Sequence, residues 1–497
     1  MHRARRLGID TGQEPVIYLH RESQVCRSEG FESETRVWVS CRDRATLATL
    51  NVVTGALLAP DEAGLSDAAW TRLAPQAGEA LRVAHQLPLD SFGFVRAKIH
   101  GKRLDADSLD AIVRDVAAGL YSDLQIGAFL VACAGGRLNQ QEITDLTRAM
   151  IGAGTQLHWE RDCVMDKHCV GGVPGNRTSL IVVPIAAVAG LLIPKTSSRA
   201  ITSPAGTADT METLAPVDLT EPAMRRVVER EGACIVWGGR ARLSPADDMF
   251  IRVEHPLDLD SAGQMIASVL SKKAAAGATR VVLDVPVGPT AKVRSPGAAL
   301  RLADGLKATG TAIGLDVLPI ITDGSQPVGR GVGPVLEARD VLAVLQGRAD
   351  APTDLRERSL LLAGHVLELG GAAPVGTGVA LARTILEDGR AWQKFQAICE
   401  AQGGMRELPR AAHVGAVPSA RAGTVRSIDN RKLARVAKLA GAPRTAVAGL
   451  ELHAHTGTRV AVGEPLFTVH AATAGMLEYA LAYLATAGDI FVVGDPQ

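Results

Sequence analysis

Two loops rich in glycine and hydroxyl side chains lie on either side of one apolar stretch, between Met165 and Leu219. The first loop combines basic, small and hydroxyl residues: Lys167, His168, Gly171, Gly172, Gly175, Thr178 and Ser179. The second is richer in hydroxyls: Lys195, Thr196, Ser197, Ser198, Arg199, Thr202, Ser203, Gly206 and Thr207. Such loops bind oxyanions, because glycine lets backbone N–H groups approach the anion and hydroxyls donate hydrogen bonds to it. Together they predict a phosphorylated substrate, or free phosphate as a reactant.

A purely structural interpretation of the two loops stays open, since glycine-rich turns also join strands to helices where no ligand binds. The basic side chains in both loops favour anion binding. Two familiar nucleotide-binding patterns do not fit. Gly171 and Gly175 are too close for GxxxxGK[ST], and this stretch contains no GxGxxG of a dinucleotide-binding unit.

Bulk properties exclude several classes of protein. The apolar run Leu180–Pro194 is shorter than the roughly 20 residues of a membrane-spanning helix and contains Pro184 and Gly190, so we expect a buried, kinked core helix and no membrane partner. A formal net charge of zero argues against nucleic-acid binding. The seven cysteines are scattered without a CxxC pair, which predicts reduced thiols and no metal site. The N-terminal segment lacks the apolar region of a signal peptide, and we expect a cytoplasmic protein.

Hydrophobic periodicity changes along the chain. Clusters of β-formers at Val37–Ser40 and Ala45–Val53 predict strands near the N-terminus. Helical spacing follows at Asp107–Gly119, Asp123–Cys133 and Gln140–Gly152, the last with Asn139 as its N-cap. From Cys163 onward, buried strands alternate with helices, which predicts a largely parallel sheet. Those strands are expected at Ala233–Trp237, Arg280–Val285 and Leu315–Ile321. The C-terminal part is again β-rich with interspersed helices.

Several separated motifs occur in an order that resembles one known family. They are Gly119–Asp123 (GLYSD), Leu146–Met150 (LTRAM), Lys167–Gly172 (KHCVGG), the run SRAITSPAGTADTMETLA that begins at Ser198, Ser268–Ala278 (SVLSKKAAAGA) and Gln326–Leu342 (QPVGRGVGPVLEARDVL). The chain resembles the thymidine phosphorylase family, and more closely its long branch, which holds AMP phosphorylase and bacterial proteins that carry the name thymidine phosphorylase. The resemblance implies a pentosyltransferase that cleaves an N-glycosidic bond with phosphate.

The resemblance also implies an organisation, which we combine with the periodicity. The expected fold class is α/β with α and α+β parts. We expect a β-rich N-terminal accessory domain (1–86), a compact barrel; a helical domain (87–160 plus 245–277); a mostly parallel α/β domain that binds phosphate and substrate (161–244 plus 278–415); and an α+β C-terminal domain (416–497). A homodimer is expected. No cofactor is implied, because inorganic phosphate is a co-substrate.

Candidate site residues follow from chemistry and from the resemblance. Lys167 is suited to act as a point-charge clamp for phosphate. The phosphate-binding candidates are Lys167, Gly171, Gly172, Ser179, Ser197 and Thr207. The substrate-binding candidates are Ser198, Arg199, Ala200, Ile201, Thr202, Ser203, Ser268, Lys272 and Lys292. Ser268 and Lys272 are four residues apart on an expected helix and share one face. The resemblance places both against the base or sugar and makes Lys292 a further substrate contact.

Two residues are candidates for assisting the departure of the base. His168 is able to donate to a carbonyl oxygen of the base, and the alternative is that it only orders its loop. The resemblance maps the proton-donating aspartate of the long branch onto Asp260, which needs a pKa raised by burial to act near neutral pH. The alternative for Asp260 is an N-cap of the helix Ala262–Lys272.

Two positions depart from the family pattern. Cys169 stands where the family carries a phosphate-binding serine, and a thiol is a weaker donor than a hydroxyl. A catalytic nucleophile at Cys169 is a poorer interpretation, because phosphate is itself the nucleophile. Arg252 is the nearest match to an arginine that grips the pyrimidine in the thymidine branch, but one extra residue intervenes.

The lead hypothesis is phosphorolysis of a nucleoside or of a nucleoside 5′-monophosphate, and the second loop favours the monophosphate. Two alternatives stay open. One is a phosphoribosyltransferase related to anthranilate phosphoribosyltransferase, in which Asp209 and Glu212 would serve a diphosphate with magnesium, although Asp209 is equally suited to cap a helix. The other is a regulator that binds a ligand without turnover.

Overall fold

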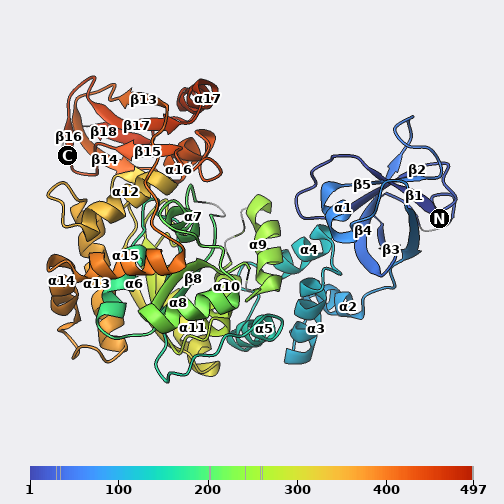
Figure 1. Ribbon diagram of the computed structural model, residues 1–497, viewed down its shortest axis with the longest axis horizontal. Helices are drawn as coiled ribbons and strands as arrows, with labels where there is room; N and C mark the ends of the chain where they lie inside the picture. Colours follow the sequence, from blue (N-terminus) through green and yellow to red (C-terminus); the bar gives the residue numbers. More distant parts are fainter. Residues whose placement is uncertain are drawn as a thin grey trace. The chain divides into compact units, whose positions relative to one another are not determined.

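The computed structural model describes residues 1–28, 31–33, 35–200, 203–240, 242–257, 259 and 261–494. Contacts divide the chain into two compact units, Met1–Ala132 and Cys133–Gln497, which we describe separately. The elements of both appear in Figure 1. The four-part division expected from the sequence stays a prediction.

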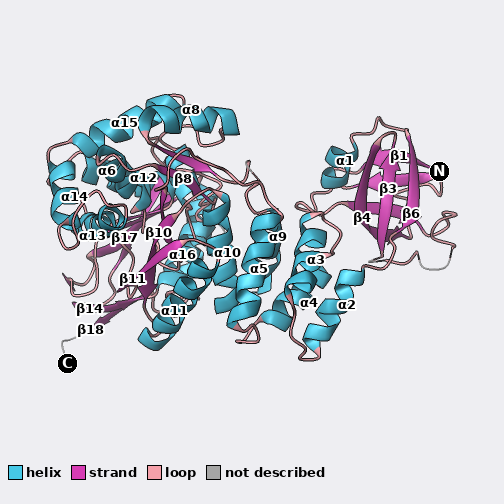
Figure 2. Ribbon diagram, turned by 90° about the horizontal axis from the view of Figure 1, so that it is seen from below, coloured by secondary structure: helices cyan, strands magenta, loops and turns pink. Residues whose placement is uncertain are grey.

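The N-terminal unit begins with a closed β-barrel, with strand order β1-β5-β2-β4-β3-β6, drawn in magenta in Figure 2. Its elements are β1 (His2–Arg6), β2 (Val16–His20), β3 (Arg36–Cys41), β4 (Arg44–Val53), β5 (Glu62–Leu65), α1 (Asp67–Leu73) and β6 (Ala80–His85), followed by α2 (Asp90–Ile99), α3 (Ala106–Ala117) and α4 (Asp123–Cys133). Ser66 accepts a hydrogen bond from the backbone N–H of Ala69 and so caps α1. The predicted strands and helices of this unit are present.

The second unit alternates helices and parallel strands. Its first part comprises α5 (Gln140–Gly152), β7 (Met165–Cys169), α6 (Ser179–Val188), β8 (Ile193–Ser197), α7 (Thr207–Glu212), α8 (Glu221–Glu231), β9 (Ala233–Trp237), α9 (Pro245–Leu257), α10 (Ala262–Ala275), β10 (Arg280–Val287), α11 (Pro296–Ala312) and β11 (Asp316–Asp323). Strands pair in parallel in the orders β11-β10-β7 and β8-β9. A parallel bridge between Val164 and Leu192 joins the two groups. The predicted parallel α/β architecture is confirmed.

The remainder of the second unit is helical and then β-rich. Its elements are β12 (Gly331–Val332), α12 (Pro334–Leu345), α13 (Thr353–Leu369), α14 (Gly378–Glu387), α15 (Arg390–Gln402), β13 (His413–Pro418), β14 (Gly423–Ile428), α16 (Asn430–Leu439), β15 (Gly449–Leu452), β16 (Arg459–Val460), β17 (Pro465–Ala471), α17 (Ala474–Leu484) and β18 (Phe491–Gly494). The C-terminal strands form antiparallel sheets, β12-β15-β17-β13 and β16-β14-β18.

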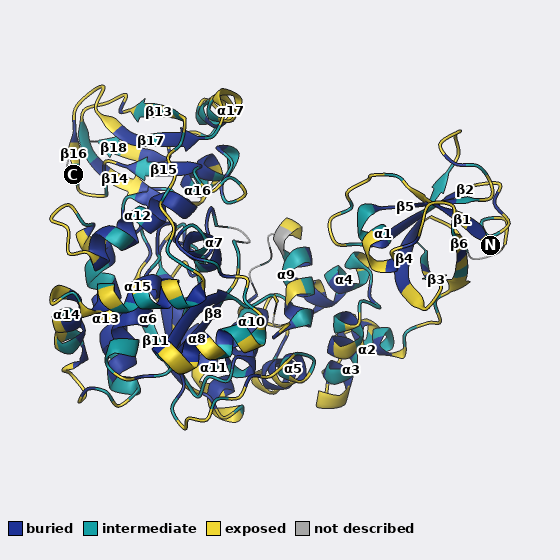
Figure 3. Cartoon of the chain, in the orientation of Figure 1, coloured by how far each residue is buried: buried dark blue, intermediate teal, exposed yellow. Residues whose placement is uncertain are grey.

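Helix α6 lies in an extensive apolar core and is buried along most of its length, as the dark blue interior of Figure 3 shows. The expectation of a single helix over Leu180–Pro194 is wrong at its C-terminal end. Helix α6 ends at Val188, and β8 already begins at Ile193. The reason is Gly190, whose φ of 85° suits glycine and turns the chain from the helix into the strand.

A buried ion cluster ties together β7, β8 and α10. Asp166 on β7 receives Lys195 of β8 at 3.2 Å and Lys273 of α10 at 2.7 Å, and all three side chains are almost fully buried. Burial alone would raise the pKa of Asp166, but the two ammonium groups hold it below its usual value. The carboxylate is therefore charged, and each of its oxygens has a cationic partner.

We expect Asp166→Ala to lower the free energy of unfolding by about 3–5 kcal/mol, because it leaves two buried ammonium groups without their counter-charge. Urea denaturation followed by circular dichroism measures the loss. Asp350→Ala is the matched control, since the Arg348–Asp350 pair is exposed on both sides and its loss should leave the unfolding midpoint unchanged. Equal midpoints for the native protein and Asp166→Ala would contradict the role given to the cluster.

Candidate active site

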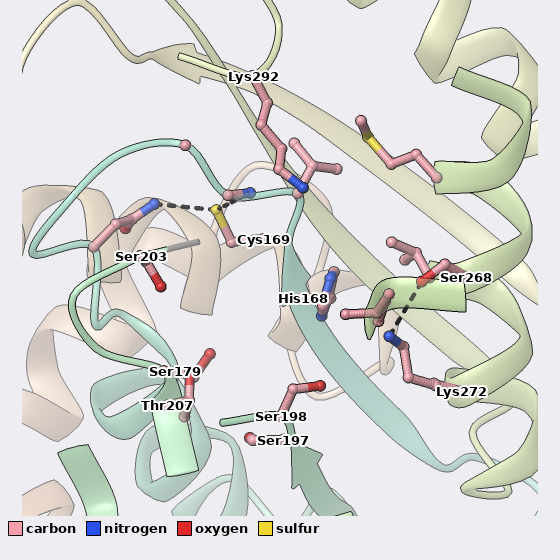
Figure 4. Close-up of a pocket in the computed structure, with 18 of the residues that line it drawn as sticks. His168, Cys169, Ser179, Ser197, Ser198, Ser203, Thr207, Ser268, Lys272 and Lys292 are labelled. Atoms are coloured by element: carbon pink, nitrogen blue, oxygen red, sulfur yellow. Dashed lines mark hydrogen bonds between the residues drawn. The ribbon is translucent and has the colours of Figure 1, made fainter. Parts of the chain in front are cut away.

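A pocket of about 260 Å³ opens where β7 and β8 end and faces helices α9 and α10. It brings together most of the predicted site residues (Figure 4). Those in its lining are Lys167, His168, Gly171, Gly172, Ser179, Ser197, Ser198, Arg199, Ser203, Thr207, Ser268, Lys272 and Lys292. Ala200 is not in the lining, and Ile201, Thr202 and Asp260 lie outside the described residues. The two glycine- and hydroxyl-rich loops therefore share one pocket.

The first loop depends on glycine at two successive positions. Gly171 and Gly172 have φ of 91° and 88°, in the region that other residues rarely adopt. A Cβ on Gly172 would lie 2.4 Å from the backbone nitrogen of Lys292. The absence of a side chain thus lets the loop pack directly against the segment that carries Lys292, and the two phosphate-loop glycines predicted from the sequence have a structural reason to be there.

Lys167 is buried in the middle of β7, and its Nζ donates to Thr178 Oγ1 at 2.5 Å. Within the described part of the chain, no carboxylate lies at ion-pair distance from this ammonium group. Burial lowers the pKa of Lys167, and the nearby Asp284 acts in the opposite direction. A buried cation without a paired carboxylate is costly, so a bound anion would stabilise its charged form.

Hydroxyl groups gather on one side of the pocket. Ser179 is the first residue of α6, Thr207 is the first residue of α7, and Ser197 ends β8. In the view of Figure 4, these lie together with Ser198 across His168 from Ser268 and Lys272. The buried Ser197 Oγ has no hydrogen-bond partner among the described residues. An oxyanion on this side would supply the acceptor that the hydroxyl lacks.

His168 lies in the centre of the pocket as Figure 4 presents it. Burial, together with the charges of Lys273, Lys195, Lys272 and Lys167, lowers the pKa of His168 well below its usual value. The imidazole is therefore neutral near pH 7. It is able to donate one N–H hydrogen bond, but it is not a source of a proton from imidazolium.

Cys169 acts as an acceptor. Its Sγ receives hydrogen bonds from the backbone N–H of Gly171 at 3.4 Å and from Asn176 Nδ2 at 3.3 Å, the two dashed lines at the sulfur in Figure 4. Burial raises the pKa of the Cys169 thiol to about 12. A thiol that stays protonated is not a nucleophile, which weighs further against covalent catalysis at this position.

The second loop is held by its own carboxylates. Arg199 pairs with Glu212 at 2.9 Å and Asp209 at 3.3 Å, and its guanidinium lies 5.1 Å from the centre of the Trp237 ring. Asp209 Oδ2 also accepts from the backbone N–H of Ala200 and of Gly206, the N-cap of α7. Asp209 therefore has the capping role considered for it, and both carboxylates proposed for a magnesium–diphosphate site are engaged by Arg199.

The opposite wall is built by α10. Lys272 Nζ donates to Asp247 Oδ2 at 2.5 Å and to Ser268 Oγ at 3.2 Å, which confirms that Ser268 and Lys272 share one face. The helix starts after Ser261, which occupies the N-cap position and makes no side-chain capping bond. Asp260 lies outside the described residues, so the capping alternative considered for it stays a prediction. Arg252 is not among the residues that line the pocket.

Sequence reasoning missed several lining residues, among them Asn176, Arg177, Glu254 and Met265. Arg177 stood inside the first loop, directly before α6, and its charge was a usable signal. Glu254 and Met265 gave none, because nothing in a single sequence shows that α9 and α10 face β7. In the described ranges, no cluster of three or more His, Cys, Asp or Glu side chains is arranged to hold a metal ion. No helix among the described residues is long and apolar enough to cross a membrane.

Comparison with protein families agrees with this architecture. Residues 93–154 match the helical bundle domain of a glycosyl transferase family, and residues 161–392 match the a/b domain of that family. Residues 424–490 match the pyrimidine nucleoside phosphorylase C-terminal domain. The fold and the pocket therefore define a glycosyl transferase that carries the C-terminal domain of the nucleoside phosphorylases.

Curated relatives identify the family within this class of glycosyl transferases. Proteins named "Putative thymidine phosphorylase" are similar over nearly the full chain: that of Polaromonas sp. (strain JS666) is 62% identical and covers 97% of this chain and 95% of its own. A relative from Legionella pneumophila (strain Paris) is 57% identical, with 99% and 95% covered. The chain belongs to the thymidine phosphorylase family and is a pentosyltransferase of that type.

One solved structure shares the fold. Anthranilate phosphoribosyltransferase from Thermus thermophilus aligns with a TM-score of 0.52 and 24% identity, over 62% of this chain and 98% of that chain. At this identity the likeness shows a common fold and carries no conclusion about activity.

We expect Cys169→Ser to keep or lower the KM for phosphate, because a hydroxyl accepts the same bonds from Gly171 and Asn176 and donates better than a thiol. Cys169→Ala is the matched control, since it removes the acceptor and should raise that KM. Steady-state rates against phosphate concentration measure both. A large loss of activity in Cys169→Ser would show that the thiol has a role of its own.

Proposed function

We propose that the pocket catalyses phosphorolysis of nucleoside 5′-monophosphates at least as efficiently as that of nucleosides. An oxygen of inorganic phosphate attacks the anomeric carbon of the pentose, the bond from that carbon to the base nitrogen breaks, and the base leaves with the electron pair. From a monophosphate the products are the free base and a pentose bisphosphate, which keeps the 5′-phosphate and carries the new phosphate on the anomeric carbon. No cofactor takes part in this scheme.

The observation that carries the proposal is the charge balance of the pocket lining. Four of its basic side chains pair with carboxylates: Arg177 with Glu337, Lys195 with Asp166, Arg199 with Glu212, and Lys272 with Asp247. Among the described residues, no carboxylate pairs with the other two, Lys167 and Lys292. Two uncompensated ammonium groups in one pocket favour two anions, the attacking phosphate and a second phosphate on the substrate.

The two lysines have different surroundings, which supports an assignment. Lys167 is buried and belongs to the loop that also carries Ser179, so we assign the attacking phosphate to it together with Ser179, Ser197 and Thr207. Lys292 is half-buried and packs beside Gly172. We assign the 5′-phosphate of the substrate to Lys292 and to Ser198 and Ser203 of the second loop.

The leaving base requires a donor on the far wall. Lys272 and Ser268 are joined by a hydrogen bond and both line the pocket, so they are suited to bind polar atoms of the base. His168 contributes as a neutral N–H donor. We keep Asp260 as the candidate acid by resemblance. Donors fixed in advance at the place where charge develops lower the barrier without reorganisation.

Arg199 disfavours the phosphoribosyltransferase alternative, because the carboxylates that would hold magnesium with a diphosphate are both paired with it.

The other alternative, a regulator that binds a ligand without turnover, is tested directly by an assay of base release. Native protein is incubated with phosphate and a panel of AMP, CMP, UMP and thymidine, and release of free base is measured. Failure to release base from any of the four would overturn the proposed function.

We expect Lys167→Ala to reduce kcat/KM by about two orders of magnitude, since one lost electrostatic contact to the reacting group costs a few kcal/mol. The rate should also lose its saturation with phosphate over the range that saturates the native enzyme. An unchanged phosphate dependence would show that the first loop does not hold the attacking anion.

We expect kcat/KM for AMP, CMP or UMP to be at least as high as for thymidine. Lys292→Met should reduce kcat/KM for the monophosphates by about tenfold or more, because it removes a charge-assisted contact to the 5′-phosphate, and should leave thymidine unaffected. The comparison of the two substrates within one variant is the internal control. A higher native kcat/KM for thymidine than for all three monophosphates would return the chain to nucleoside specificity.

A further inference from the structure

Arg177 is a basic residue of the pocket to which neither the resemblance nor the comparisons assign a role. It precedes α6 directly, and only 11% of its side chain is exposed. Its position in the lining puts a guanidinium group on the wall that also carries Ser179, two residues further along the chain.

A buried carboxylate fixes the orientation of this guanidinium. The Nε of Arg177 forms an ion pair with Glu337 of α12, whose side chain is 1% exposed. Glu337 is in turn held by the backbone N–H of Gly333 at 3.1 Å and by Thr210 Oγ1 at 3.4 Å. Because Glu337 contacts the Nε side of the guanidinium group, the two terminal nitrogens of Arg177 are available to other acceptors.

One of those terminal nitrogens sets the direction of a neighbouring hydroxyl. Nη1 of Arg177 donates to Thr207 Oγ1 at 3.1 Å. A hydroxyl has a single hydrogen, and an oxygen that accepts from Arg177 keeps that hydrogen for an acceptor of its own. Thr207 is thereby prepared to donate into the pocket, as a phosphate oxygen requires.

The other terminal nitrogen, Nη2, is available to a ligand. Nη2 donates no hydrogen bond to any residue in the described part of the chain. Guanidinium groups bind tetrahedral oxyanions through two parallel N–H donors, which is more directional than the point charge of a lysine. The pocket also has a use for a strong donor here, because the thiol of Cys169 is a weaker donor than a hydroxyl.

We infer that Arg177, oriented by Glu337, is a binding residue for the attacking inorganic phosphate, which it contacts through Nη2 while it directs the Thr207 hydroxyl at the same anion. The inference rests on the proposed function, in which phosphate is a reactant. It assigns Glu337 the part of a positioning residue that acts through Arg177. The 5′-phosphate of the substrate remains with Lys292, so the two anions are bound by different cations.

Calorimetric titration of the full chain with inorganic phosphate tests the inference in Arg177→Met, Arg177→Lys and Glu337→Gln. We expect the Kd for phosphate to rise by about 30-fold or more in Arg177→Met and by about tenfold in Arg177→Lys, which keeps the charge but loses the fork. Glu337→Gln should raise it by a smaller factor. Glu231→Gln is the matched control, because the Glu231–Lys394 pair is also buried on its acidic side but belongs to α8 and α15 outside the pocket.

Steady-state kinetics separate this role from a structural one. In Glu337→Gln and Arg177→Lys, the KM for phosphate should rise while the KM for the nucleotide stays unchanged. A parallel rise of both KM values, or a phosphate Kd in Arg177→Lys equal to that of the native protein, would overturn the inference. If the native protein bound phosphate through Arg177 but released no base, this inference would hold and only the proposed function would be rejected.

Discussion

The buried carboxylate of Asp166 is the interaction on which the pocket depends. Each member of its cluster is a near neighbour in sequence of a residue that lines the pocket. Asp166 precedes Lys167 on β7, Lys195 lies two residues before Ser197 on β8, and Lys273 follows Lys272 on α10. Since the two ammonium groups contact different oxygens of one carboxylate, a single ionic cluster fixes two strands and a helix relative to one another, and with them three walls of the site.

Lysines of this region also influence the protonation of the pocket residue His168. Lysines around His168 add to the effect of burial and keep the imidazole neutral, so this histidine serves as a hydrogen-bond donor rather than as an acid. Burial also keeps the Cys169 thiol protonated. A pocket with neutral His168 and Cys169 and with two unpaired ammonium groups is organised to attract anions and to hold them. Acid catalysis, where the reaction needs it, has to come from another group, and Asp260 keeps that candidacy.

The local sequence predicted the elements well, because caps and periodicity are local properties. Asn139 and Glu142 form the complete capping box of α5, and β9 has the predicted bounds Ala233–Trp237. The meeting of the two loops was also predictable in outline, since parallel strands place their carboxyl ends at one edge. The end of α6 was misjudged because apolar residues continue past Gly190 into β8. The contacts of Glu337 with Arg177 and of Asp166 with Lys273 could not be predicted from the sequence, because they depend on how distant helices pack and leave no periodic signal.

Family membership fixes the reaction class more firmly than the substrate, and the pocket explains why. The backbone features that the phosphorolysis scheme requires, such as the positive φ of Gly171 and Gly172 and the start of α6 at Ser179, are set by the fold. Choice of substrate depends instead on a few terminal groups, Lys292 on one side and Lys272 with Ser268 on the other. A fold of this kind is therefore able to keep one phosphate-binding wall while the facing wall changes. The ion pair between Arg177 and Glu337 belongs to the constant wall, because it joins the segment before α6 to α12 through a buried contact, whereas Lys292 is only half-buried and is free to vary.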